Sequence, residues 1–295
     1  MRSLGSIARA TALEILSEPL SLLVLLAALA LAVLAPVFHC HQFGEPTRMA
    51  RDAGLSAIFT CGSALAVFGT VRTFRREIET GTMAMALAHP VSRAGFFLAK
   101  IAGAFAAYLV FAATVLLTAL AIVAGAAVGG ARAAETGDLA RLWWPGLAAG
   151  VAVIVLPVVL GAALNRFARC RFVLSTLLAA LGCSALAAGF AAFAAPGEVV
   201  RMLPAAVPLA FLAAVLLVAS AAACVRFGGS AAAACAGLVF VAFAPVIGNY
   251  YLADALSGGG RVPWSYVGLA LLGTAPAVAL FAWLGIHLIN GRDIT

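Results

Sequence analysis

The sequence predicts an all-α protein whose helices cross a lipid bilayer several times. Of its 295 residues, 65% are hydrophobic and only 10% are charged, whereas a soluble domain carries about a quarter charged residues. Such a chain could not hide its apolar surface from water, so its solvent must be lipid. Within a bilayer only helices and closed barrels satisfy the backbone, and the apolar runs lack the alternation of barrel strands. We therefore expect a polytopic helix bundle that forms one domain over residues 20–295.

The first 19 residues have the pattern of an amphipathic helix. Apolar or small side chains recur every three or four positions and would line one face: Leu4, Ile7, Ala8, Thr11 and Ile15. Charged side chains keep the remainder polar: Arg2, Arg9, Glu14 and Glu18. Such a helix can lie in the plane of the lipid headgroups, which is the position expected for residues 1–19. A short tail that merely begins the first span is the alternative.

Eight apolar runs are candidate spans, because a hydrocarbon core of about 30 Å requires roughly 20 residues of helix. The runs cover residues 20–38, 55–71, 101–128, 145–164, 172–195, 205–225, 231–253 and 265–290. Prolines within or beside the later runs could turn one of them into a broken or re-entrant helix: Pro196, Pro204, Pro208 and Pro245. Six spans with re-entrant helices is therefore the alternative to eight.

The distribution of Lys and Arg predicts the orientation, because loops rich in these residues stay on the cytoplasmic side. With eight spans and the N-terminus inside, 12 of the 18 basic residues and the C-terminus lie in the cytoplasm. The outer loops then sum to zero, and the inner ones carry the whole net charge of +7. The basic character is therefore a signal of topology, and no nucleic-acid partner is expected.

The densest group of charges lies between the second and third runs. Three basic residues, which would hold the end of the second span at the inner surface, precede two acids: Arg72, Arg75, Arg76, Glu77 and Glu79. The chain can turn at Gly81, and Thr82 is a candidate N-cap for a new helix. Proline lacks an N–H and disfavours a helical residue before it, so Pro90 would end that helix. We therefore predict a short helix over residues 82–89.

This short helix carries little charge and contains Met83, Met85 and Leu87. Methionine adapts to contact surfaces, which suits a helix that must stay packed while its partner moves. A loop that lies on the lipid explains the same pattern equally well. Ser92 is placed to cap the next helix, which would carry Arg93 and Lys100 into the third span.

The stretch REIETGTMAMALAHPVSRAGFFLAKIAG resembles the signature of ABC-2 type permeases, the membrane subunits of ATP-binding-cassette exporters. The positions that match in order and spacing are Glu77, Glu79, Gly81, Thr82, Pro90, Val91, Ser92, Arg93, Lys100 and Gly103. Ala99 is a departure, because the family commonly has glycine there. The resemblance covers roughly residues 1–125, beyond which only hydropathy agrees. Family members usually have six spans, so eight would be a further departure.

The resemblance implies that residues 82–89 form a coupling helix seated in a cleft of a separate nucleotide-binding ATPase subunit. ATP and Mg²⁺ would bind to that partner, and this chain would hold no cofactor and perform no chemistry. The family works as two permeases with two ATPases, so a second copy or a related permease is expected. The docking residues that it implies are Arg75, Arg76, Glu77, Glu79, Gly81, Thr82, Met83, Met85, Leu87, His89, Pro90 and Arg93.

One cluster resembles a metal site: His39, Cys40 and His41, after the first run. A fourth ligand is not apparent and zinc sites usually want four, so a polar loop is the preferred interpretation. Ion-coupled carriers place charged residues inside the membrane, and none lies near the middle of any run, which disfavours a gradient-driven carrier. An intramembrane enzyme would need clustered polar groups there. We therefore expect an ABC-2 exporter permease in a prokaryotic inner membrane, and a membrane anchor that transports nothing is the remaining alternative.

Overall fold

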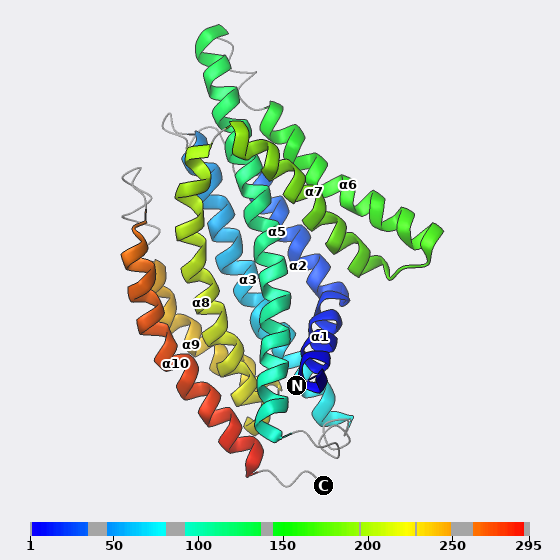
Figure 1. Cartoon of the computed structure of the whole chain (residues 1–295), viewed down its shortest axis with the longest axis vertical. Helices are drawn as coiled ribbons and strands as arrows, with labels where there is room; N and C mark the ends of the chain where they lie inside the picture. The colour runs from blue at the N-terminus through cyan, green and yellow to red at the C-terminus, as the bar shows by residue number, and fades with distance from the viewer. Residues whose placement is uncertain are drawn as a thin grey trace.

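A computed structural model of the chain describes residues 2–34, 46–80, 92–136, 144–194, 196–227, 229–248 and 262–291. These residues form helices and contain no strand. The helices are α1 (Arg2–Leu16), α2 (Pro19–Leu34), α3 (Pro46–Glu79), α5 (Arg93–Thr136), α6 (Trp144–Ala168), α7 (Phe172–Ala194), α8 (Pro196–Phe227), α9 (Gly229–Gly248) and α10 (Trp264–Asn290). The expected all-α bundle is therefore confirmed (Figure 1).

The number of candidate spans is smaller than eight. Among the described residues, six helices are long and apolar enough to cross a membrane: α3, α5, α6, α7, α8 and α10. α1 and α2 qualify only together, as a pair bent by 63°, which would make seven. The apolar part of α9, Ala231–Ala242, is too short, since twelve residues of helix rise only about 18 Å. The alternative of six spans with broken pieces is closer to the structure.

The bend between α1 and α2 follows from the residues at the corner. Pro19 has no N–H to donate and is favoured at the first position of a helix, so it ends α1 and begins α2. The corner is closed by the hydroxyl of Ser21, which donates to the carbonyl oxygen of Ile15 at 2.5 Å. The chain therefore changes direction at Ser17 and Glu18, which lie between the two helices.

α3 and α5 are packed as an antiparallel pair in the middle of the bundle (Figure 1). Two glycines of α3 permit the close approach, as small residues do between membrane helices. A Cβ atom on Gly54 would lie 2.3 Å from Cβ of Ala119, and one on Gly62 would lie 2.9 Å from the ring of Tyr108. The Tyr108 hydroxyl donates to the carbonyl oxygen of Leu209 at 3.2 Å, which joins α5 to α8.

α1 packs along α5 through the apolar face expected from the sequence. Thr11 and Ile15 are buried, and a Cβ atom on Gly103 of α5 would lie 2.3 Å from the carbonyl oxygen of Ala8. The apolar face of α1 thus packs against another helix of the protein. Contact of the polar face with lipid headgroups stays a prediction. α6 and α7 form a hairpin on the same side of the bundle as α1 and α2, and its turn leans away from the central helices (Figure 1).

Candidate functional site at the junction of α3 and α5

The candidate docking segment, residues 81–91, joins the end of α3 to the start of α5. α3 closes at Thr80, whose amide and hydroxyl both donate to the Arg76 carbonyl oxygen, at 2.9 and 2.8 Å. α5 begins beside Ser92, whose hydroxyl oxygen accepts a hydrogen bond from the Gly95 amide at 3.1 Å. The expected cap at Ser92 is therefore confirmed. The predicted helix itself lies outside the described residues, together with Gly81, Thr82, Met83, Met85, Leu87, His89 and Pro90.

Glu77 and Lys100 pair across the two helices that flank this segment in the sequence. The Lys100 Nζ lies 2.5 Å from Oε2 of Glu77, and the lysine side chain has 0% exposed surface. Nζ also lies 4.8 Å from the ring centroid of Phe74 and 5.7 Å from that of Phe96, within reach of cation–π attraction. A buried ammonium group is costly unless it is paired. The sequence places Lys100 merely at the edge of the third span, whereas the structure makes it the centre of the junction.

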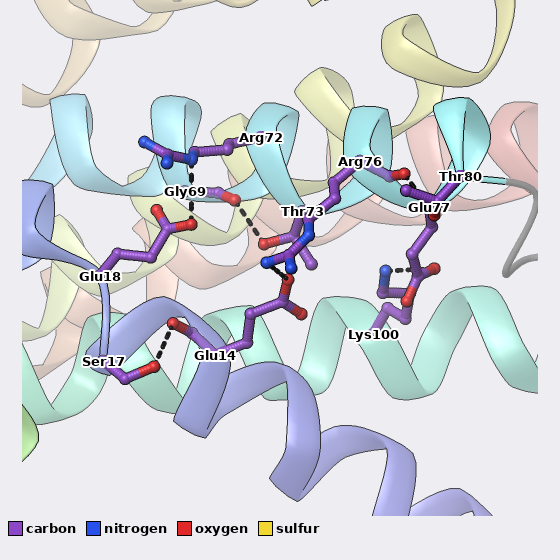
Figure 2. A network of polar contacts seen from close by, with 10 residues as sticks. All are labelled: Glu14, Ser17, Glu18, Gly69, Arg72, Thr73, Arg76, Glu77, Thr80 and Lys100. Carbon is purple, nitrogen blue, oxygen red and sulfur yellow. Dashed lines mark hydrogen bonds and ion pairs between the residues drawn. The ribbon is translucent and has the colours of Figure 1, made fainter. Parts of the chain in front are cut away.

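Two carboxylates of the α1 corner face two arginines of α3 (Figure 2). Nε of Arg72 lies 3.0 Å from Oε1 of Glu18, and Nη1 of Arg76 lies 3.4 Å from Oε1 of Glu14. These pairs are absent from the sequence interpretation, which treats the acids only as the polar side of an amphipathic helix. A signal for them exists, because the acids are four residues apart and so are the arginines. The spacing of the arginines places both on one face of α3, and Glu18 follows the end of α1 closely enough to reach the same face.

Arg75 and Glu79 occupy the outward side of the last turns of α3. Nε of Arg75 lies 2.6 Å from Oε1 of Glu79, and both side chains are more than half exposed. An exposed pair of this kind contributes little to stability. These two charged groups therefore lie at the surface beside the docking segment, where a partner could reach them.

Arg93 connects the start of α5 to the end of α10. Its Nη1 donates to the carbonyl oxygens of Ile289 and Asn290, at 3.3 and 3.2 Å. The last carbonyls of a helix lack intrahelical partners and attract a cation. Four residues further on, the Phe97 ring packs so closely that a Cβ atom on Gly285 would lie 2.3 Å from it. The sequence predicts Arg93 as a docking residue, and the structure adds that its guanidinium holds α10 in place.

The structure does not test the weak metal candidate, because His39, Cys40 and His41 lie outside the described residues. Within the ranges that the structure describes, no three His, Cys, Asp or Glu side chains are grouped as they would be around a metal ion.

These features define a multi-pass helical membrane protein with a charged junction between two central spans at one end of the bundle. A family model described as "ABC-2 family transporter protein" matches residues 17–185. Because this is more than half of the 295 residues, the chain belongs to the ABC-2 transporter family and is a permease-type membrane component. The match extends well beyond residue 125, where the resemblance read from the sequence ends. Searches of curated proteins and of solved structures found no match.

Proposed function

We propose that this chain is the membrane-spanning subunit of an ABC-2 type exporter, and that residues 82–89 dock onto a separate nucleotide-binding ATPase. Family membership supports the transport role. The observation that supports coupling is the buried pair between Glu77 and Lys100, which joins the helices on either side of the docking segment. ATP and Mg²⁺ bind to the partner, and a second copy of this permease or a related one completes the transporter.

The junction is built to transmit a displacement of the docking segment. The segment continues into α3 at one end and into α5 at the other, so a force on it acts on both helices. Removing one partner of a buried ion pair costs roughly 3–5 kcal/mol, and the rings of Phe74 and Phe97 pack edge to face at 5.7 Å beside the pair. A push on the segment therefore moves α3 and α5 together and does not separate them.

The same junction carries the displacement to α1 and α10. Glu14 and Glu18 connect α1 to α3 through their arginine partners, and Arg93 connects α5 to the end of α10. Rigid elements joined by polar networks are a physical route for coupling between distant sites. Helices at opposite sides of the bundle would thus respond to one docking event.

The charge distribution supports a cytoplasmic position for this end of the bundle. The pairs and pockets of the structure place several basic residues of the loops and helix ends together here: Arg72, Arg75, Arg76, Arg93 and Arg171. Loops and helix ends rich in Lys and Arg remain on the cytoplasmic side, where ATP is available to a docked ATPase. The proposed location is the inner membrane of a prokaryotic cell.

Co-purification with the ATPase tests the proposal. The substitution Leu87→Pro breaks a helix over residues 82–89, because proline there removes the hydrogen bond to residue 83 and its ring clashes with that carbonyl. The matched control Leu87→Ala preserves the helix and removes only the long side chain. We expect Leu87→Pro to release the ATPase from membranes that contain normal amounts of the permease, whereas Leu87→Ala retains most of it. Full retention of the ATPase by Leu87→Pro would overturn the docking assignment.

A further inference from the structure

A polar pocket of about 390 Å³ lies beside the corner between α1 and α2. Its charged lining comes from three parts of the chain that are far apart in sequence: Glu14 and Glu18 from the corner, Arg72 and Arg76 from α3, and Arg171 from the turn between α6 and α7. Ala10, Leu13, Ser17 and Pro19 complete the wall. Three cations and two carboxylates therefore surround one cavity.

The cations of this pocket are more accessible than its acids. The side chains of Glu18 and Glu14 are 13% and 29% exposed, whereas those of their partners Arg72 and Arg76 are 58% and 66% exposed. Arg171, which is also exposed, adds a third cation. The carboxylates hold one edge of two guanidinium groups, and the other edges remain at the surface. A group that enters the pocket therefore meets positive charge first.

The surrounding helices place this pocket at the level of the lipid headgroups. α6 ends at Ala168 and α7 begins at Phe172, so the turn between two apolar spans lies next to the cavity through Arg171. Backbone outside regular structure and charged side chains do not lie in hydrocarbon on the lipid side, so this turn marks the membrane surface. α2 also begins here, at Pro19. The open side of the pocket thus adjoins lipid.

We infer that this pocket binds the phosphate group of an anionic phospholipid, with Arg72, Arg76 and Arg171 as the donors. The planar guanidinium group suits phosphate because it donates two parallel hydrogen bonds. Basic pockets between membrane helices bind lipid head groups in this way. A free phosphate ion has the same chemistry, but a lipid also gains from contact of its acyl chains with exposed apolar side chains of α2 and α7, such as Leu23 and Leu178. Arg76 is also one of the docking residues that the family resemblance implies, so the test below changes Arg171 and Glu14, which are not.

Binding of phosphatidylglycerol to the purified full-length chain tests this inference. The chain is held in phosphatidylcholine nanodiscs, and retention of added phosphatidylglycerol is measured by native mass spectrometry. Arg171→Gln is compared with Arg166→Gln, which removes the same charge from an exposed position at the end of α6 that does not line the pocket. We expect about fivefold weaker binding of phosphatidylglycerol to Arg171→Gln, because one basic residue near a charged membrane surface contributes about this factor to the affinity. Arg166→Gln should stay within about twofold of the parent.

A second variant, Glu14→Gln, should increase the affinity for phosphatidylglycerol. Glu14→Gln removes a carboxylate from the wall without removing a donor, so phosphatidylglycerol should bind more tightly than to the parent chain. Equal losses for Arg171→Gln and Arg166→Gln would show that only general charge attraction is present and would overturn the site. Equal retention of phosphatidylcholine and phosphatidylglycerol would do the same. If inorganic phosphate alone displaces bound phosphatidylglycerol at comparable concentration, the pocket is a site for free anions and the assignment to lipid is wrong.

Discussion

Lys100 of α5 and Glu77 of α3 form an ion pair in which the lysine has no exposed surface and the two charged atoms are 2.5 Å apart. The pair brackets the candidate docking segment, since Glu77 precedes residue 81 and Lys100 follows residue 91. Both residues belong to the stretch that resembles ABC-2 permeases, and their contact gives a physical reason for their presence. The pair keeps the two ends of the docking segment together at the base of the central helices.

Substitution of Lys100 by Met leaves the Glu77 carboxylate without its cation. We expect the free energy of unfolding to fall by roughly 3–5 kcal/mol, as it does when one partner of a buried pair is removed. The double variant Lys100→Met with Glu77→Leu should regain most of this loss, because an apolar pair of similar volume is often as stable. Denaturation of the purified chain in detergent measures both values. A double variant as unstable as the single one would contradict the interpretation of the pair.

Gly103→Ala places a methyl group where the backbone of α1 lies. The new Cβ would be 2.3 Å from the carbonyl oxygen of Ala8, so α1 must move away from α5. Overpacking of this kind costs about 1–3 kcal/mol, and hydrogen exchange in α1 should become faster. Gly182→Ala in α7 is the matched control, because its Cβ would have nothing within 4 Å. That control should leave exchange in α1 unchanged, and a faster exchange in both variants would refute the specific contact.

Neutralising Arg75 and Glu79 together separates docking from folding. Their side chains are exposed and pair with each other along α3, so the melting temperature of Arg75→Gln with Glu79→Gln should stay close to that of the parent. If the ATPase contacts this surface, co-purification should weaken. It should also become less sensitive to salt, because salt screens the attraction between exposed charges at the edge of an interface and the variant lacks two of these charges. Unchanged co-purification at both low and high salt would remove these two residues from the docking surface.

Much of the bundle could be predicted because a helix that crosses lipid must be apolar along its length, and apolar runs are visible in the sequence. A span is a run of about 20 apolar residues, and the run predicted over 172–195 begins at Phe172, as does α7. The N-cap at Ser92 depends on neighbours only three residues away. The span count was less predictable, because α2 has only 16 residues and continues around a corner into α1.

The sequence alone determined that this is a polytopic helical membrane protein and that its distinctive charges gather between the second and third spans. Only the tertiary structure decided that Lys100 is buried against Glu77, that Glu14 and Glu18 face two arginines of α3, and that Gly103 lets α1 approach α5 closely. The physical reason is the separation in sequence between the residues that each feature depends on. Hydropathy and caps are local properties, whereas a contact between two helices depends on the rotation and register of segments that lie far apart in sequence.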